Sequence, residues 1–337
     1  MRCLPRLEIV LACLLLAGAA EARIEDCRRL NLVDRTTGAP IVGVEDIRIT
    51  PDGTRAYLSA YDRRAEPPTE GALVPLELDR LADAPDTLDV DGWRPRPPTP
   101  GGFRPHGIAL DENEDLLVVN RRIGRPTTID RLEIVAGGLN EVSSRRLPEV
   151  CNPNAVAALA GDALLVSNDR AACTSGALRL ETWLGRARGS IHRVIDSRAE
   201  PVLSGLAFPN GLAVVERNLW FAETRGRRVT VFAPFGPELA RSYAVGFAPD
   251  NLTVDAQGRI WVAGPPNLLA YAAFIRGWPF FDRVGSRVAV IEAGAVEQVL
   301  DDDGGLVSGA TVAAAGGGWL LIGAAYDDAI AYCRLVG

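Results

Sequence analysis

Apolar and polar residues alternate over short segments along most of this chain, and the alternating segments come in pairs. Each pair has the form of a β-hairpin, because a polar residue opens the first segment, a turn of Gly, Asp or Asn follows, and a segment rich in Val, Leu, Ile, Trp or Phe returns. Six hairpins of this form recur every 40 to 61 residues, beginning at Val44, Pro105, Pro153, Pro209, Pro249 and Gly309. The pattern predicts an all-β protein built from repeated units.

A single hairpin cannot bury its own faces, so the repeated units must pack on one another. Four-stranded units at this spacing are typical of the blades of a β-propeller, and six hairpins predict a six-bladed β-propeller. A solenoid would need capping repeats, and a barrel would need evenly spaced strands. Two segments depart from the strand pattern: residues 177–185 predict a short helix, and the Pro-rich stretch 92–105 predicts a long loop.

The first 22 residues differ from the rest of the chain. Arg2 and Arg6 precede an apolar run at 9–20, and the Ala-Glu-Ala triplet at 20–22 has the small-x-small form of a cleavage site. We therefore expect residues 1–22 to be a signal peptide, the protein to be exported (secreted or periplasmic), and residues 23–337 to form a single propeller domain. A transmembrane anchor and a lipid-modified Cys13 are the alternatives, but the apolar run is too short to span a bilayer with its flanks.

Four cysteines remain after the predicted cleavage site: Cys27, Cys151, Cys173 and Cys333. Three pairings are possible for an exported protein, in which disulfides persist. Cys151 and Cys173 are almost equidistant from the turn at 161–162, which places them opposite each other across two strands. Cys27 and Cys333 would then join the two ends of the chain, a link that fits the closure of a ring of blades. Buried free thiols are the alternative.

Composition removes several classes of function. The net charge of −7 and the pI near 5.1 argue against nucleic acid or an acidic membrane surface as the main partner. All 36 basic residues are Arg, so neither a Schiff-base lysine nor a P-loop lysine exists. The two histidines, His106 and His192, are too few for a three-histidine zinc site, and no GxSxG motif is present. A small-molecule partner remains.

The opening positions of the hairpins carry the candidate chemistry. In a propeller the first strand of each blade lines the central channel, so equivalent repeat positions form a ring around the axis. These positions hold side chains that an apolar strand does not need: Glu45, His106, Asn154, Asn210 and Asp250, with Asn251 adjacent. Two carboxylates and three carboxamides suit Ca²⁺, which accepts six to eight irregular oxygen ligands. Asn and Asp also open strands as turn formers, but five at or beside matching positions favour one axial Ca²⁺.

At this point the sequence resembles the serum paraoxonases, a family of calcium-dependent lactonases and arylesterases. The likeness runs from Cys27 to Cys333. It is carried jointly by six motifs in order, which are GVEDI at 43–47, RPHGIAL at 104–110, VSND at 166–169, PNGL at 209–212, PDNLTVD at 249–255 and LLIGAAY at 320–326. The resemblance implies a six-bladed propeller with two calcium ions and a disulfide between the chain ends.

The family's residues map onto the chain with two departures. Its catalytic-calcium ligands match Glu45, Asn154, Asn210, Asp250 and Asn251, the set already selected by the repeat alignment. Its second, structural calcium would use Asp46, the backbone carbonyl of Ile108 and an aspartate whose position holds Ala155, which makes this ion doubtful. The family's histidine dyad matches His106, but its second position holds Arg121. A nearby guanidinium favours a neutral imidazole, so His106 can accept a proton but cannot relay it.

The resemblance implies hydrolysis of an ester or lactone, with Ca²⁺ polarising the carbonyl and either His106 or an axial carboxylate such as Asp250 activating water. Phe208 and Tyr326 match positions that wall the substrate pocket. The predicted helix at 177–185 matches the family's lid helix, but two charged residues in nine make membrane association weak at most. His192 is expected to be ordinary surface or packing on an outer strand.

Two other readings stay open. A gluconolactonase-like or strictosidine-synthase-like propeller would share the axial acidic and amide residues, although the terminal cysteines together with the VEDI and PDNL motifs are not expected there. A propeller that binds a ligand and catalyses nothing is the alternative of a different class, and Arg121 and Ala155 favour it. Turnover with and without a chelator separates these readings.

Overall fold

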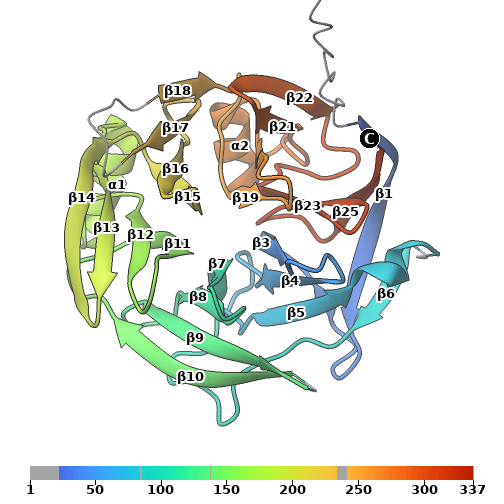
Figure 1. The fold of residues 1–337 in the computed structure, drawn as a ribbon, viewed down its shortest axis with the longest axis horizontal. Coiled ribbons are helices and arrows are strands. Elements are labelled where there is room, and N and C mark those ends of the chain that lie inside the picture. The colour runs from blue at the N-terminus through green and yellow to red at the C-terminus, as the bar shows by residue number, and fades with distance from the viewer. Residues whose placement is uncertain (1–22, 84–85, 137, 234–240, 337) are drawn as a thin grey trace, which may run out of the picture.

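Six β-sheets form a ring around a central axis in the computed structural model (Figure 1). It describes residues 23–83, 86–136, 138–233 and 241–336, so the predicted signal peptide lies outside the described residues. The fold-class prediction of an all-β, six-bladed β-propeller is confirmed. In the part of the chain just defined, no helix is long and apolar enough to cross a membrane.

The strands of each blade follow the chain outward from the axis in all but the last blade. The first blade consists of β3 (Val44–Ile49), β4 (Arg55–Ala60) and β5 (Ala72–Glu77). The second consists of β7 (Pro105–Leu110), β8 (Leu116–Asn120), β9 (Thr128–Val135) and β10 (Gly138–Arg146). The third consists of β11 (Pro153–Ala158), β12 (Leu164–Asn168), β13 (Gly189–Ile195) and β14 (Arg198–Leu206).

The remaining blades repeat the plan. The fourth consists of β15 (Pro209–Val215), β16 (Asn218–Glu223), β17 (Arg228–Phe232) and β18 (Arg241–Ala244). The fifth consists of β19 (Leu252–Val254), β20 (Ile260–Gly264), β21 (Ser286–Glu292) and β22 (Ala295–Asp302). The sixth consists of β23 (Val312–Gly316), β24 (Trp319–Gly323), β25 (Ile330–Val336) and part of β1 (Arg23–Asp34).

The six predicted hairpins are the two innermost strands of the six blades. The second strands β8, β12, β20 and β24 are buried along their whole length. Each is covered on both faces by neighbouring blades, which explains why these segments are mostly apolar rather than alternating. The hydrophobic core consequently lies between the blades.

Strand β1, at the start of the described chain, closes the ring. One part of β1 pairs antiparallel with β25, between Arg23↔Val336 and Leu30↔Ile330. Its last residues pair with β2 (Pro40–Ile41) and, in parallel, with β6 (Thr87–Val90) beside the first blade. A disulfide joins Cys27 on β1 to Cys333 on β25 across 306 residues. The expected covalent link between the chain ends is therefore present within the sixth blade.

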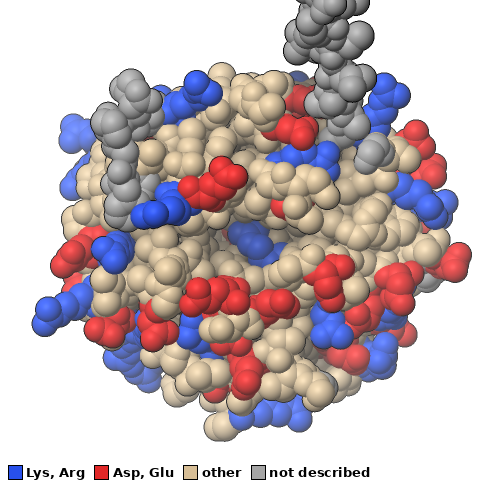
Figure 2. All heavy atoms as spheres, viewed as in Figure 1, with Lys and Arg blue, Asp and Glu red and all other residues tan. Residues whose placement is uncertain are grey.

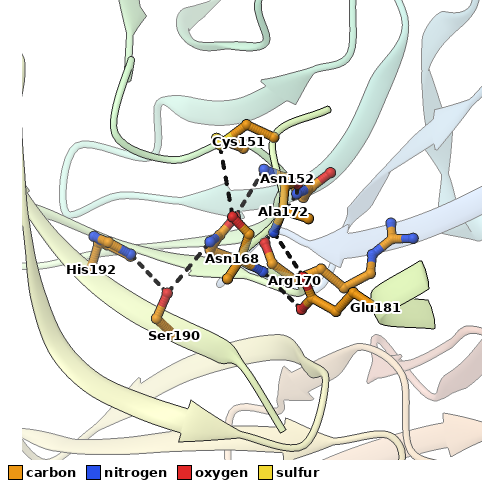
Figure 3. Close-up of a disulfide and its surroundings, with 10 residues drawn as sticks. Cys151, Asn152, Asn168, Arg170, Ala172, Glu181, Ser190 and His192 are labelled. Carbon is orange, nitrogen blue, oxygen red and sulfur yellow. Dashed lines mark hydrogen bonds between the residues drawn. A yellow bond between two sulfur atoms is a disulfide. The ribbon is translucent and has the colours of Figure 1, made fainter. Parts of the chain in front are cut away.

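The third blade carries the second disulfide and the predicted helix. Cys151, just before β11, is bonded to Cys173, which follows β12. The helix α1 (Ser175–Leu184) comes next, and its Glu181 carboxylate accepts the N–H groups of Ala171 and Ala172 at 3.0 and 2.8 Å (Figure 3). The expected short helix is thus confirmed and is anchored to the disulfide segment. Its Trp183 is 82% exposed.

His192 lies in the third strand of this blade rather than on the surface. It is 8% exposed on β13, where its Nε2 atom is 2.8 Å from the Ser190 hydroxyl. Figure 3 shows Asn168, Ser190 and His192 in one row across β12 and β13. A packing role fits this position, because strand β14 covers β13 on its outer side.

One helix was not expected from the sequence. The helix α2 (Leu268–Ile275) interrupts the fifth blade between β20 and β21. Its sequence, LLAYAAFI, is apolar on every side and so has no helical period to detect. The side chain of Asn267 caps it by accepting the N–H groups of Leu269 and Ala270. The Pro-rich stretch 92–105 is a loop, as predicted, with one isolated bridge from Trp93 to Leu73.

Candidate active site

Four blades share one irregularity at the axial end of their first strand. The pairing register shifts between Val44 and Asp46 in the first blade and between Pro105 and Ile108 in the second. The third and fourth blades shift between residues 153 and 156 and between 209 and 212. Such a β-bulge redirects the side chain that it contains. The residues inside the four shifts include the predicted axial residues Glu45, His106, Asn154 and Asn210.

Glycine next to an axial residue lets neighbouring blades approach. A Cβ atom on Gly107 would lie 2.4 Å from the carbonyl oxygen of Asn154 and 2.8 Å from Cα of Ala155. Both atoms belong to the first strand of the next blade, so any larger residue at 107 would push the two inner strands apart. The PHG sequence of the second blade is explained by this contact.

The structure buries five of the six predicted axial residues and brings three of them into contact. Asn251 donates from Nδ2 to Oε1 of Glu45 at 2.9 Å, and His106 Nδ1 is 3.4 Å from Glu45 Oε2. Asn154 and Asn210 are 5% and 4% exposed. Asp250 is part-exposed, and its main chain links to the same region because its carbonyl accepts the N–H of Gly211 at 2.9 Å.

The three axial carboxamides share an arrangement that suits a cation. Each donates from its NH₂ group to an oxygen of a neighbouring residue: Asn251 to Glu45, Asn154 to Asp169 at 3.4 Å, and Asn210 to Thr224 at 3.5 Å. The Oδ1 atoms of all three are buried without a hydrogen-bond partner, and so is Oε2 of Glu45. Buried oxygens are rarely left unpaired. Four unpaired oxygens among the predicted ligands therefore fit a calcium ion.

The acidic residues alone would not make a metal site. Among the residues that the structure describes, no group of three or more His, Cys, Asp and Glu side chains is placed to hold a metal ion. Burial raises the pKa of Glu45 and raises that of Asp250 well above its usual range, although the Arg63 guanidinium opposes both shifts. Raised carboxylate pKa values show an electrostatic cost that a divalent cation would offset.

The residues expected for a second calcium do not fit a metal. Both oxygens of Asp46 already accept N–H donors, Oδ1 from Ile47 at 2.9 Å and from Arg48 at 2.5 Å, and Oδ2 from Ile108 at 2.8 Å. Ala155 supplies no side-chain oxygen. Burial raises the pKa of Asp46 to about 7 even with the Arg48 charge beside it. A guanidinium thus occupies the place beside Asp46 that a cation would take.

His106 lies among cationic groups. Burial and the Arg121 guanidinium, followed by that of Arg63, lower the pKa of His106 well below its usual value. Arg121 donates from Nη2 to the carbonyl of Pro153 at 3.0 Å and lies 3.8 Å from the Asp169 carboxylate. The position of the family's second dyad histidine therefore holds a cation that favours neutral His106.

Sequence reasoning missed two residues at this site. Arg63 donates from Nη2 to Nδ1 of His106 at 3.0 Å. Tyr271 comes from the unexpected helix α2, and burial with the nearby Asp250 charge raises its pKa well above the usual range. Neither residue lies in a repeated segment, so no alignment of hairpins would have selected it. Figure 2 shows a basic side chain inside the central opening of the ring.

A cavity of about 520 Å³ adjoins the axial site beside the seam between the first and sixth blades. Its wall includes Arg63, Arg64, Phe274 and Tyr326. Tyr326, which the resemblance assigns to the wall of a substrate pocket, lines this cavity. Phe208 is not part of this wall, since its ring lies 5.4 and 5.5 Å from the guanidinium groups of Arg170 and Arg225 in the third and fourth blades.

Comparison with protein families identifies the family of this chain. The sequence model described as Arylesterase matches residues 96–335, more than two thirds of the chain. The chain belongs to the arylesterase family. The match includes His106, Asn154, Asn210, Asp250 and Asn251, whereas Glu45 lies before its first residue. The resemblance seen in the sequence motifs is confirmed. The comparison with curated proteins gave no match.

Solved structures show the same fold at low sequence identity. Regucalcin, a calcium-binding protein from Agrobacterium tumefaciens, is 13% identical with a TM-score of 0.54, over 92% of this arylesterase-family chain and 95% of its own. A PQQ-bound aldose sugar dehydrogenase from Streptomyces coelicolor is 14% identical with a TM-score of 0.54, over 92% and 98%. A gluconolactonase from Xanthomonas campestris is 18% identical with a TM-score of 0.47, over 88% and 98%. The likenesses to regucalcin and to the sugar dehydrogenase show the fold alone.

Proposed function

We propose that this arylesterase-family protein is an exported hydrolase of carboxylic esters and lactones that depends on one axial calcium ion. The observation that carries the proposal is the set of buried, unpaired oxygens on Glu45, Asn154, Asn210 and Asn251. Family membership supports hydrolysis of a small ester or lactone, and the acidic chain argues against a nucleic-acid partner.

The residues that would hold the ion are Glu45, Asn154, Asn210, Asp250 and Asn251. When bound there, calcium would polarise the scissile carbonyl and stabilise the developing oxyanion, a contribution of several kcal/mol to the barrier. Asp46 and Ile108 are not proposed as ligands of a second ion, because Arg48 and two backbone N–H groups already occupy the Asp46 carboxylate.

The protein's own groups would bind substrate and move its proton. The cavity walled by Phe274 and Tyr326 offers aromatic surface to the acyl or alcohol part of an ester. Two groups are candidates for accepting the proton of the attacking water, the imidazole of His106 and the carboxylate of Asp250. Phe208 would serve as a pocket wall only for a substrate that reaches toward the fourth blade.

Metal content and turnover measured on the same sample test this proposal. We expect calcium in the protein as purified, hydrolysis of phenyl esters or lactones, loss of activity with a chelator and recovery when calcium is added back. Zinc in place of calcium, or a chelator without effect on either turnover or stability, would contradict it. Calcium binding without turnover of phenyl esters, simple lactones or aldonolactones would favour a ligand-binding propeller.

A further inference from the structure

Arg63 is the residue that faces His106 most directly. Its Nη2 atom lies 3.0 Å from Nδ1 of the imidazole. A guanidinium carries donors and no acceptor, and it stays protonated. Nδ1 must therefore be the acceptor in this hydrogen bond, so in neutral His106 the proton is on Nε2.

The other neighbour of Nδ1 agrees with this assignment. Oε2 of Glu45 is 3.4 Å from Nδ1, and it has no hydrogen-bond partner although it is buried. If Nδ1 carried a proton, Glu45 would be its natural acceptor, and the shorter contact with Arg63 would become a clash between two donors. With the proton on Nε2, Arg63 is satisfied and Oε2 of Glu45 stays free for a metal ion.

Arg63 is itself held in place from two blades. Its Nη1 atom donates to the carbonyl oxygens of Gly43, Tyr61 and Ala325 at 3.0, 3.2 and 3.1 Å. Its guanidinium also stacks on the Tyr61 ring, 3.8 Å from the centroid. Gly43 makes room for this anchor, because its φ is +68° and a Cβ there would lie 2.4 Å from the Tyr61 carbonyl and 3.2 Å from Nη1 of Arg63.

The opposite nitrogen of His106 makes no well-formed hydrogen bond, although the neighbouring Asn154 side chain partly opposes the lowering of the imidazole pKa. Nε2 is buried and makes no hydrogen bond. Such an unpaired N–H group beside the predicted metal-binding oxygens is suited to donate a hydrogen bond to a substrate oxygen. It is not suited to bind the metal ion, because a cation repels an N–H donor. A neutral imidazole can polarise a carbonyl by donating from such a position.

We infer that Arg63 is a positioning residue that holds His106 as the Nε2–H tautomer, so that His106 donates a hydrogen bond to a substrate oxygen rather than accepting the proton of water. The hydrogen bond to a substrate oxygen rests on the proposed function, whereas the tautomer of His106 is a property of the protein without substrate.

The chain offers a direct spectroscopic test because it has only two histidines. ¹⁵N-histidine labelling of the calcium-loaded protein reports which imidazole nitrogen carries the proton, and His192→Gln assigns the two sets of signals. We expect His106 to show at least about a tenfold excess of the Nε2–H tautomer, as a hydrogen bond from a charged donor should impose. A proton on Nδ1 in the unmodified protein would overturn the inference.

Three variants connect the tautomer to Arg63. In the calcium-free protein, Arg63→Met should abolish the excess, because Oε2 of Glu45 is then the nearest partner of Nδ1 and can accept a hydrogen bond from an Nδ1–H group. Arg63→Lys keeps a cationic donor and should retain Nε2–H. Arg64→Met is the matched control, since Arg64 lines the same cavity but donates only to the carbonyls of Tyr326 and Phe274. An unchanged tautomer in Arg63→Met would overturn the role of Arg63.

The test remains decisive if Arg63→Met fails to fold, because the unmodified protein and Arg63→Lys still report the tautomer. It also stands apart from the proposed function, since the spectra are recorded without substrate. A protein that shows the Nε2–H tautomer but hydrolyses no ester or lactone would contradict the function and leave the positioning role intact.

Discussion

Asn251 in the fifth blade donates from Nδ2 to both Oε1 and the carbonyl oxygen of Glu45 in the first blade, at 2.9 and 3.0 Å, across 206 residues of sequence. The carboxamide is thereby fixed with its own oxygen turned away from Glu45 and unpaired. The pair links two predicted calcium ligands that are remote in the chain, and it fixes the orientation of both before any ion binds.

The first prediction concerns this pair. Asn251→Leu and Glu45→Gln should each weaken calcium binding by about 100-fold or more, since even outer residues of metal sites contribute 10- to 100-fold. Calcium titration by calorimetry measures the change. Asp196→Asn, which removes an acidic group from an exposed turn between β13 and β14, is the charge-matched control. Equal calcium affinity in Glu45→Gln and the control would contradict the assignment.

The second prediction is that the protein binds one calcium ion and not two. Arg48 takes the place of a cation beside Asp46, and its side chain is only 13% exposed. Arg48→Met should reduce the free energy of unfolding by about 3 to 5 kcal/mol, because it leaves a buried carboxylate without its partner. Arg55→Met, which breaks the part-exposed pair with Glu77, should change it by no more than about 1 kcal/mol.

Elemental analysis of the purified protein checks the stoichiometry, and denaturant unfolding checks the two variants. Two tightly bound calcium ions per chain in the unmodified protein would show that Arg48 does not replace a metal.

The third prediction compares the two disulfides. On the chain-entropy model, a bond that closes 306 residues stabilises by roughly 5 to 6 kcal/mol and one that closes 22 residues by roughly 3 kcal/mol. The double variant Cys27→Ser with Cys333→Ser should therefore lose more stability than Cys151→Ser with Cys173→Ser. Guanidinium unfolding curves measure both. The reverse order would show that the ring is held closed without help from its covalent link.

The fourth prediction concerns acid stability. Burial alone would raise the pKa of Asp34, but hydrogen bonds from Arg94 and from the N–H of Thr36 hold it below its usual value of 3.8. The stabilisation is complete above pH 3.8 and is lost as the pH falls through the lower folded pKa. Asp34→Asn should cost about 1.5 to 3 kcal/mol at pH 7 and nearly nothing below that folded pKa.

Unfolding free energies measured from pH 7 down to the acid limit give this profile. Asp91→Asn is the control, because the pair between Asp91 and Arg35 is exposed on both sides and should contribute little at any pH. A penalty for Asp34→Asn that persists in acid would point to packing and not to charge.

The fifth prediction separates the two roles of His106. If it donates a hydrogen bond, His106→Gln keeps a donor and should lower kcat/KM for a lactone by about tenfold or less, whereas His106→Leu should lower it by about 10² or more. If it is the general base, both variants should lose 10² or more. Arg121→His adds a second comparison: a proton relay would raise turnover and move its pH profile, and a donor role would do neither.

The repeated parts of this molecule could be predicted from sequence because each hairpin carries its own signal. Glu45, Asn154 and Asn210 stand at equivalent positions of aligned segments, so the repeat identified them without a structure. Arg63 has no equivalent in the other blades, and its partner Ala325 lies 262 residues away. The pairing of Arg48 with Asp46 could not be predicted either, because the sequence does not determine the side-chain conformation of an Arg on a strand.

The order of the strands in the sixth blade has a consequence for biosynthesis. The first described strand pairs with the last, so β1 leaves the ribosome long before its partner β25 exists. At 5 to 20 residues per second, the 306 residues between Cys27 and Cys333 take roughly 15 to 60 s to synthesise. During that interval the part of β1 from Arg23 to Leu30 lacks its partner strand and is an exposed edge that can join other chains. Early binding by a chaperone or rapid export of the unfinished chain would protect it until the final blade arrives.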